Sequence, residues 1–348
     1  MTQPLPALTD LHAVRPAIYW ADLLLSATLG WAAFAVAAAE PLGSPIGIAS
    51  AVVAVFALYR AVAFTHEISH QRHRLPGFEA AWNALAGFPL LLPSFTYAQV
   101  HFDHHRVATY GTRNDPEYLP FARSAALTTV YILQALIIPA LLVIRFLLLA
   151  PIGLFSRRFE IWLIEHASAI TINRAYRRTA SAALIRVVRR DTWLLLAMWT
   201  ILIGLGFLAH NPEAWAAVFG KGHAPIVDAF IPVRAAVLWY LLMAAINVID
   251  GLRTLAAHSY ESSGEPMDKA AQTADSHDIP GSLLTELWAP VGLRYHATHH
   301  AFPGIPYHAL PRAFRRLSAA MPDSYGKMTQ PGLLRTLWAL YRKGMRAA

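Results

Sequence analysis

The chain has no cysteine among its 348 residues. This absence excludes disulfide bonds, thiolate metal sites and cysteine nucleophiles, so any metal ligands must be nitrogen or oxygen atoms. Charged residues are also scarce, at 14%, whereas hydrophobic residues make up 56%. Soluble domains carry about 25% charged residues, so the composition predicts an integral membrane protein.

Acidic residues are fewer than basic ones, 21 against 29, which gives a net charge of +8. The basic residues lie between and after the apolar runs. In a membrane protein this pattern indicates topology, and nucleic acid is not an expected partner. Twelve arginines fall between Phe102 and Asp191. By the positive-inside rule that segment is cytoplasmic.

Four apolar runs predict transmembrane helices, because about 20 residues at 1.5 Å each cross a hydrocarbon core. They are residues 18–39, 46–64, 193–209 and 231–249. With four crossings, both termini lie in the cytoplasm and the chain spans an inner or plasma membrane. The expected fold is all-α, a single integral-membrane domain over residues 1–348, with a cytoplasmic helical cap that carries the histidines described below.

Two further apolar stretches do not fit a simple crossing. Residues 82–100 contain Gly87, Pro89 and Pro93 and must begin and end on the same side, which predicts a re-entrant or in-plane hairpin. Residues 130–155 contain Pro139, Arg145 and Pro151. One crossing there would put the later histidines on the wrong side, so this stretch is predicted to be interfacial or re-entrant.

Histidines gather in three short clusters and one isolated position. On a helix, the spacings i, i+3 and i+4 place side chains on one face. The candidate metal ligands are His66, His70, His101, His104, His105, His258, His296, His299 and His300. Nine imidazoles exceed what one tetrahedral zinc ion uses, so they favour two metal ions. His73, in a basic and polar stretch, and His210 and His223, in an expected external loop, are not included.

Three acids near these clusters are candidates to accept the second ring N–H of a ligand and fix its tautomer: Glu67, Asp103 and Asp250. Asp250 lies at the end of a predicted span, where an unpaired charge is costly.

The clusters have the forms HX3H, HX2HH and HX2HH, and they follow the second span, precede the third and follow the fourth. This arrangement resembles the membrane fatty acid desaturase and hydroxylase superfamily over about residues 50–315. His258 looks like the family's additional ligand, and residues 299–306, HHAFPGIP, are similar to the end of its third box. The resemblance implies two non-haem iron ions, O2 as co-substrate and a lipid acyl-chain substrate.

Details of the boxes qualify this resemblance. The first box has the spacing of acyl-lipid desaturases and is also similar to that of sphingolipid desaturases. The third begins with His296 rather than the Gln of front-end desaturases. One departure is Thr254, four residues before His258, where the acyl-CoA branch has Asn. A cytochrome b5 haem motif is absent, so the electron donor is expected to be a separate ferredoxin or cytochrome b5-like protein.

The leading hypothesis is an acyl-chain desaturase that acts on a fatty acyl or sphingoid lipid. A lipid or carotenoid hydroxylase or ketolase on the same scaffold is the alternative, because both reactions begin with the same hydrogen abstraction. A membrane zinc hydrolase and a metal transporter are less favoured. Zinc cannot supply an oxidant, and transporter ligands lie near the bilayer midplane.

Overall fold

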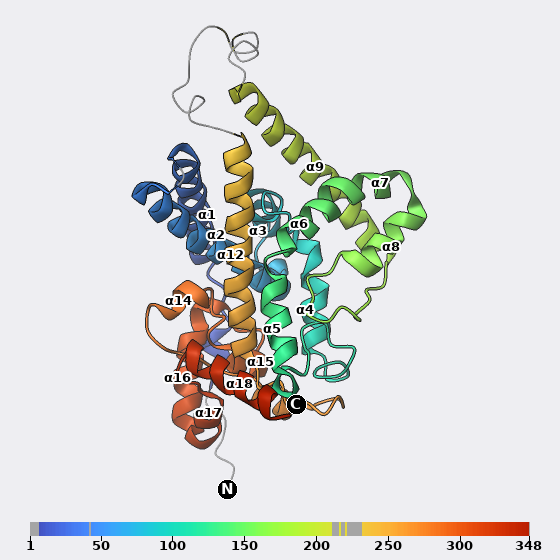
Figure 1. Cartoon of the computed structure of the whole chain (residues 1–348). Coiled ribbons are helices and arrows are strands. Elements are labelled where there is room, and N and C mark those ends of the chain that lie inside the picture. The colour runs from blue at the N-terminus through green and yellow to red at the C-terminus, as the bar shows by residue number, and fades with distance from the viewer. Residues whose placement is uncertain (1–6, 42, 211–215, 217–219, 221–231, 348) are drawn as a thin grey trace.

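The computed structural model describes residues 7–41, 43–210, 216, 220 and 232–347. Helices dominate these residues (Figure 1), and the β-pairing within them is confined to isolated bridges. The all-helical class is therefore confirmed. His223 and the first residue of the predicted run 231–249 lie outside the described residues.

Five helical stretches are long and apolar enough to cross a membrane: Pro16–Ala39, Pro45–Arg74, Ile138–Phe155, Ala182–Leu208 and Val233–Ala257. Four of them overlap the four predicted runs. They belong to α1 (Pro16–Ala39), α2 (Pro45–Gln71), α9 (Ala182–His210) and α12 (Pro232–Ala257). Several apolar helices of spanning length support an integral membrane protein.

The fifth stretch, predicted to be interfacial or re-entrant, is a continuous helical run of spanning length. It consists of α6 (Ile138–Val143), a π-helical turn η6 (Ile144–Leu149) and α7 (Ala150–Phe155). Pro139 lies in the first turn of the run, where no helical N–H bond is required. Pro151 is the second residue after the π-helical turn, where the hydrogen-bonding pattern changes.

After α7 the chain returns to the end of the molecule that carries the second histidine cluster. Helix α8 (Arg157–Ala167) follows, and the next segment binds the backbone near that cluster. The N–H of Ile170 donates to the carbonyl of Thr96 at 2.8 Å. The N–H of Ile172 donates to the carbonyl of Pro116 at 2.9 Å. The segment from α6 to α8 therefore leaves this end and comes back to it.

Residues 82–100 turn back within the bundle. Helix α3 (Phe78–Trp82) continues into a π-helical turn, η3 (Asn83–Gly87), and a short turn η4 (Ser94–Thr96) leads into α4 (Ala98–His105). Indole N–H groups bind carbonyls at the tip: Trp31 to Leu85 at 2.7 Å, Trp199 to Phe88 at 2.9 Å and Trp239 to Pro89 at 3.0 Å. These donors come from α1, α9 and α12, and they satisfy backbone carbonyls of the hairpin.

Helix α2 is long enough to carry a histidine cluster beyond the hydrocarbon core. Ser44 caps its start by accepting a hydrogen bond from the N–H of Gly47 at 2.9 Å. Its 27 residues extend about 40 Å, about 10 Å more than a hydrocarbon core. It packs closely on α1, where a Cβ atom on Gly30 would lie 2.6 Å from Leu58 Cγ.

Short helices gather at the lower end of α12 (Figure 1). They are α13 (Lys269–Asp275), α14 (Thr285–Trp288), α15 (His296–Ala301), α16 (Leu310–Ala320), α17 (Pro322–Met328) and α18 (Leu333–Ala347). Asp278 joins three parts of this cap: its backbone pairs with Tyr295 and Thr329, and its carboxylate accepts the N–H of Thr298 at 3.1 Å. The N–H of the neighbouring His277 donates to the carbonyl of Ala257 at 2.8 Å, so the third histidine cluster is fixed against the end of α12.

Candidate metal centre

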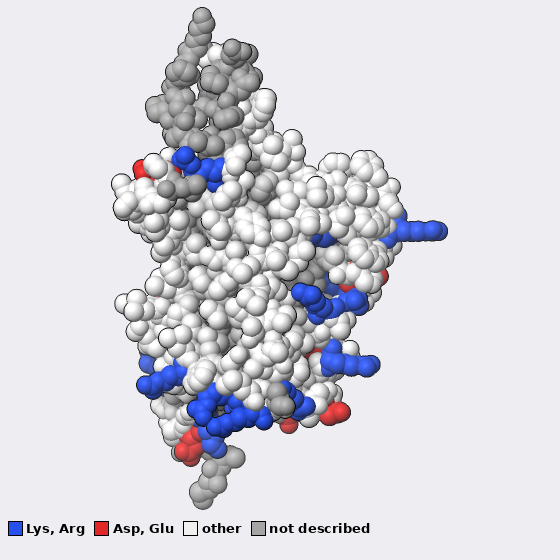
Figure 2. Space-filling view, in the orientation of Figure 1, with Lys and Arg blue, Asp and Glu red and all other residues white. Residues whose placement is uncertain are grey.

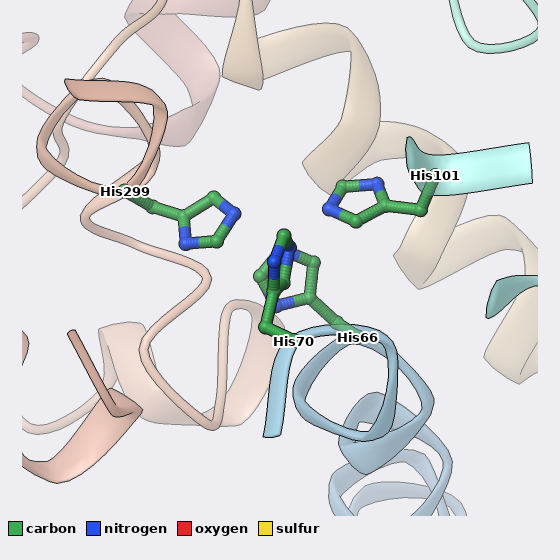
Figure 3. Close-up of side chains that lie close together, drawn as sticks. All are labelled: His66, His70, His101 and His299. Carbon is green, nitrogen blue, oxygen red and sulfur yellow. The ribbon is translucent and has the colours of Figure 1, made fainter. Parts of the chain in front are cut away.

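Four elements supply the histidine side chains. Helix α2 carries His66 and His70 on its last two turns, and α4 carries His101, His104 and His105. His258 directly follows α12, and α15 carries His296, His299 and His300. Because helical spacing aligns each cluster on one face, all three faces can converge. Figure 3 shows the rings of His66, His70, His101 and His299 pointing toward one another.

Eight of the nine histidines form two groups in which one nitrogen from each ring lies within 4.8 Å of the others. The first group is His66, His70, His101 and His299. The second is His104, His258, His296 and His300, all of them buried. Both groups draw on the second and third clusters, so the two groups share α4 and α15 and lie side by side.

His105 lies between the two groups. Its Nε2 atom is 3.0 Å from Nε2 of His101 and 3.2 Å from Nε2 of His299, both in the first group. Its ring stacks on that of His300 in the second group, with ring centroids 4.2 Å apart. All nine predicted ligands therefore belong to one continuous cluster.

The spacing of the ring nitrogens suits metal ions. In the second group, Nε2 of His296 lies 3.0 Å from Nε2 of His258 and 3.1 Å from Nε2 of His300. Two nitrogens that each bind one ion at about 2.1 Å and at right angles lie about 3.0 Å apart. Several buried ring nitrogens have no hydrogen-bond partner, including Nε2 of His104 and both ring nitrogens of His66. A bound cation would satisfy them.

Burial also keeps the rings in the form that binds metal. It lowers the pKa well below the ordinary histidine value for His101, His105, His258, His296, His299 and His300. These rings are neutral near pH 7, and a neutral imidazole offers a nitrogen lone pair. Two metal ions therefore fit the donor set, which contains no carboxylate or thiolate.

A layer of acids and hydroxyl groups surrounds the histidines. Asp115 Oδ1 lies 2.9 Å from Nδ1 of His104. Glu117 Oε1 lies 3.0 Å from Nδ1 of His101. The hydroxyl of Tyr110 lies 2.8 Å from Nδ1 of His258. These contacts occupy the outer nitrogen and leave Nε2 to face the cluster, as a partner of a ligand histidine should.

The two carboxylates differ in their electrostatics. Burial lowers the pKa of His104, but the charge and hydrogen bond of Asp115 outweigh it, and the net shift is upward. Burial raises the pKa of Glu117 to about 7. Asp115 also accepts the N–H of Gly111 at 2.8 Å and the N–H of Glu117 at 2.9 Å, so its carboxylate is held rigidly.

Two of the acids predicted to accept a ring N–H of a ligand histidine, Asp103 and Asp250, bind other groups. Asp103 accepts a hydrogen bond from Tyr176 at 2.6 Å and pairs with Arg106 at 3.0 Å. Asp250 pairs with Arg253 at 2.8 Å.

Glu67 accepts the N–H of Tyr307 at 3.1 Å and the hydroxyl of Tyr19, and its other oxygen is 3.7 Å from Nδ1 of His66. Of the three, Glu67 alone approaches a histidine of the cluster. Asp115 and Glu117, which lie in the segment after α4, are not among the acids predicted from the sequence.

Comparison with known proteins agrees with this geometry. The sequence profile of the family described as "Fatty acid desaturase" matches residues 42–332. The ceramide hydroxylase of Caulobacter vibrioides (strain NA1000 / CB15N) is 35% identical over 339 residues, which cover 96% of this chain and 91% of that protein. No solved structure shows significant similarity. The family resemblance predicted from the histidine clusters is confirmed.

Proposed function

The chain belongs to the fatty acid desaturase family, and from this premise we propose that it is a di-iron, O2-dependent hydroxylase of a ceramide-type lipid. The family and the hydroxylase relative identify an oxidoreductase of lipid metabolism. Hydroxylation takes precedence over desaturation because the relative that matches nearly the full length of the chain is a hydroxylase.

The observation that carries the proposal is the pair of four-histidine groups joined through His105. His66, His70, His101 and His299 would hold one iron ion, and His104, His258, His296 and His300 the other. Two iron ions, when bound, would supply the reduction of O2 and the oxidation of an unactivated C–H bond, which redox-inert zinc cannot do. Burial keeps six of the rings neutral, and Asp115, Glu117 and Tyr110 orient His104, His101 and His258.

Atom and electron balance defines the partners. Hydroxylation converts R–H, O2, two electrons and two protons into R–OH and water, and desaturation removes two hydrogens instead. The electrons would come from a separate ferredoxin or cytochrome b5-like protein. Basic side chains near the lower end of the molecule suit an acidic donor (Figure 2).

The proposed topology has four crossings, with both termini and the histidines in the cytoplasm. The return of the chain after α7 to the second histidine cluster supports it, because a single crossing by Ile138–Phe155 would leave the chain on the opposite side. The basic residues near the same end agree with the positive-inside rule (Figure 2).

Lipid mass spectrometry tests the reaction. Cells that express the wild-type protein should accumulate a ceramide heavier by one oxygen atom, and cells that express His104→Ala should not. Purified wild-type protein should hold about two iron ions per chain, one for each four-nitrogen group. A product lighter by two hydrogens would establish the desaturase alternative, and bound zinc without oxidised lipid would contradict both.

A further inference from the structure

A cleft of about 590 Å³ opens beside the histidine cluster. It lies between α4, the turn after α2 and the first turns of α9. Its apolar lining residues include Phe95, Phe102, Leu184 and Val187. This volume is within the range of pockets that hold small organic ligands, and the apolar wall suits a hydrocarbon chain.

The cleft extends from the first turns of α9 to the candidate metal centre. Its lining residues Ala183, Leu184 and Val187 belong to the first turns of the helical stretch Ala182–Leu208, ahead of the predicted span 193–209. His105, the ring shared by the two histidine groups, is also part of its lining. The ring of Phe102 contacts that of His70, with centroids 5.7 Å apart. A hydrocarbon chain that occupied the cleft would therefore lie beside the histidine cluster.

The polar part of the lining is basic. Arg72, Arg106 and Arg178 contribute guanidinium groups, and Glu79 is the one carboxylate among the described lining residues. Arg178 is only 3% exposed. Its Nη1 group donates to the carbonyls of Phe95 at 2.6 Å and Ser168 at 2.8 Å, and no carboxylate pairs with it among the described contacts. Its Nε atom has no hydrogen-bond partner among the described residues. A buried guanidinium with an unused donor favours an added oxygen acceptor.

A second cleft reaches the outer side of the histidine cluster, away from the Nε2 atoms. It has a volume of about 100 Å³ and is lined by Tyr97 and Glu117. Both contact the Nδ1 atom of His101, which faces away from the other rings. A chain placed there would meet the outer layer and not the face of the rings.

We propose that the 590 Å³ cleft binds the lipid substrate, with the hydrocarbon chain along Phe102 and Leu184 and an acceptor oxygen of the head group on Arg178. This assignment rests on the proposed function, since it names the lipid site of the same centre. The acceptor is either the amide carbonyl or hydroxyl oxygen of a neutral ceramide or the phosphate of a phosphorylated one.

Photo-crosslinking tests the site without turnover. The full chain, in lipid nanodiscs, is irradiated with a ceramide that carries a diazirine on its acyl chain, and the labelled peptides are mapped by mass spectrometry. Labels should fall on residues 95–102 and 181–187. Ala183→Trp fills the cleft and should reduce labelling at least fivefold. Ala182 is also exposed but does not line the cleft. Labelling of Ala182→Trp should therefore stay within twofold of wild type.

Equal labelling of the two tryptophan variants, or labels confined to the second cleft around residues 134–138 and 247–254, would overturn the assignment. Because crosslinking requires neither electrons nor O2, the result is independent of whether the lipid product is hydroxylated or desaturated. The experiment can therefore contradict the assignment of the lipid site without contradicting the proposed hydroxylation.

Arg178→Gln tests the head-group contact. Loss of a charged donor should weaken binding about tenfold, measured by competition of unlabelled ceramide against the photoprobe. Parallel competition with ceramide 1-phosphate shows whether Arg178 binds a neutral oxygen or a phosphate. A larger loss of affinity for the phosphorylated lipid identifies an anionic head group. An equal loss of affinity for both lipids identifies an acceptor that both carry. Unchanged competition by both lipids would remove Arg178 from the proposal.

Discussion

Both carboxylate oxygens of Asp115 lie within hydrogen-bond distance of Nδ1 of His104, at 2.9 and 3.1 Å. Both side chains are buried, and the same carboxylate is fixed by two backbone N–H groups of its own turn. Nε2 of His104 is left without a hydrogen-bond partner. The carboxylate therefore selects the tautomer that presents a lone pair to the second histidine group.

Asp115→Asn should reduce metal affinity or activity about 10- to 100-fold, as outer-layer substitutions at histidine sites typically do. The amide keeps the approximate shape of the turn but removes the charge that orients His104. Iron per chain and hydroxylated lipid are the measurements. Asp103→Asn is the matched control, because Asp103 contacts Tyr176 and Arg106 and no histidine of the cluster. An equal loss in both variants would show that the effect is not specific to His104.

The histidine groups could be predicted from sequence because their decisive spacing is local. Helical spacing of i, i+3 and i+4 aligns each cluster on one face whatever the rest of the chain does. The same rule, applied to the acids, excludes one candidate. At about 100° per residue, Asp103 points away from the face shared by His101 and His105, and its carboxylate does bind elsewhere.

Asp250 is separated from the one ligand that its own segment supplies. It lies eight residues before His258, about 12 Å along a helix, and its carboxylate pairs with Arg253 instead. Asp115 and Glu117 could not be assigned to His104 and His101 from spacing. Their contacts depend on how the turn after α4 folds back, which the sequence pattern does not specify. The cleft lining is likewise assembled from distant segments.

Tyr110→Phe should affect the second histidine group more than the first. Its hydroxyl contacts Nδ1 of His258 at 2.8 Å and Asp275 at 2.9 Å, so its removal leaves His258 less well oriented. We expect about tenfold weaker binding of one of the two iron ions, measured by iron titration of the metal-free protein.

Tyr118→Phe is the control for this variant. The Tyr118 hydroxyl also contacts Asp275, at 3.3 Å, but has no hydrogen bond to a histidine of the cluster. If both variants lost iron equally, the cause would be the environment of Asp275 and not the contact with His258.

Metal removal should destabilise the fold. Ring nitrogens from α2, α4 and α15 and from the residue after α12 converge on one cluster, so bound metal crosslinks four segments. A ligand at 100 times its Kd stabilises the folded state by about 2.7 kcal/mol. Anaerobic addition of Fe2+ to chelator-treated protein should therefore raise the Tm. His104→Ala should show a smaller rise, and an equal rise in both would place the stabilising metal elsewhere.

The tip of the hairpin offers a test of the fold that is independent of the metal. Trp239 is 8% exposed, and its indole N–H donates to the carbonyl of Pro89 at 3.0 Å. Trp239→Phe leaves this buried carbonyl without its partner and should cost about 1–3 kcal/mol in the free energy of unfolding. Trp338→Phe, at an exposed ring of α18, is the control and should change it by less than about 0.5 kcal/mol. SDS unfolding in bicelles measures both. No loss in Trp239→Phe would mean that water or another donor reaches the tip, and the hairpin would then not lie in a dry interior.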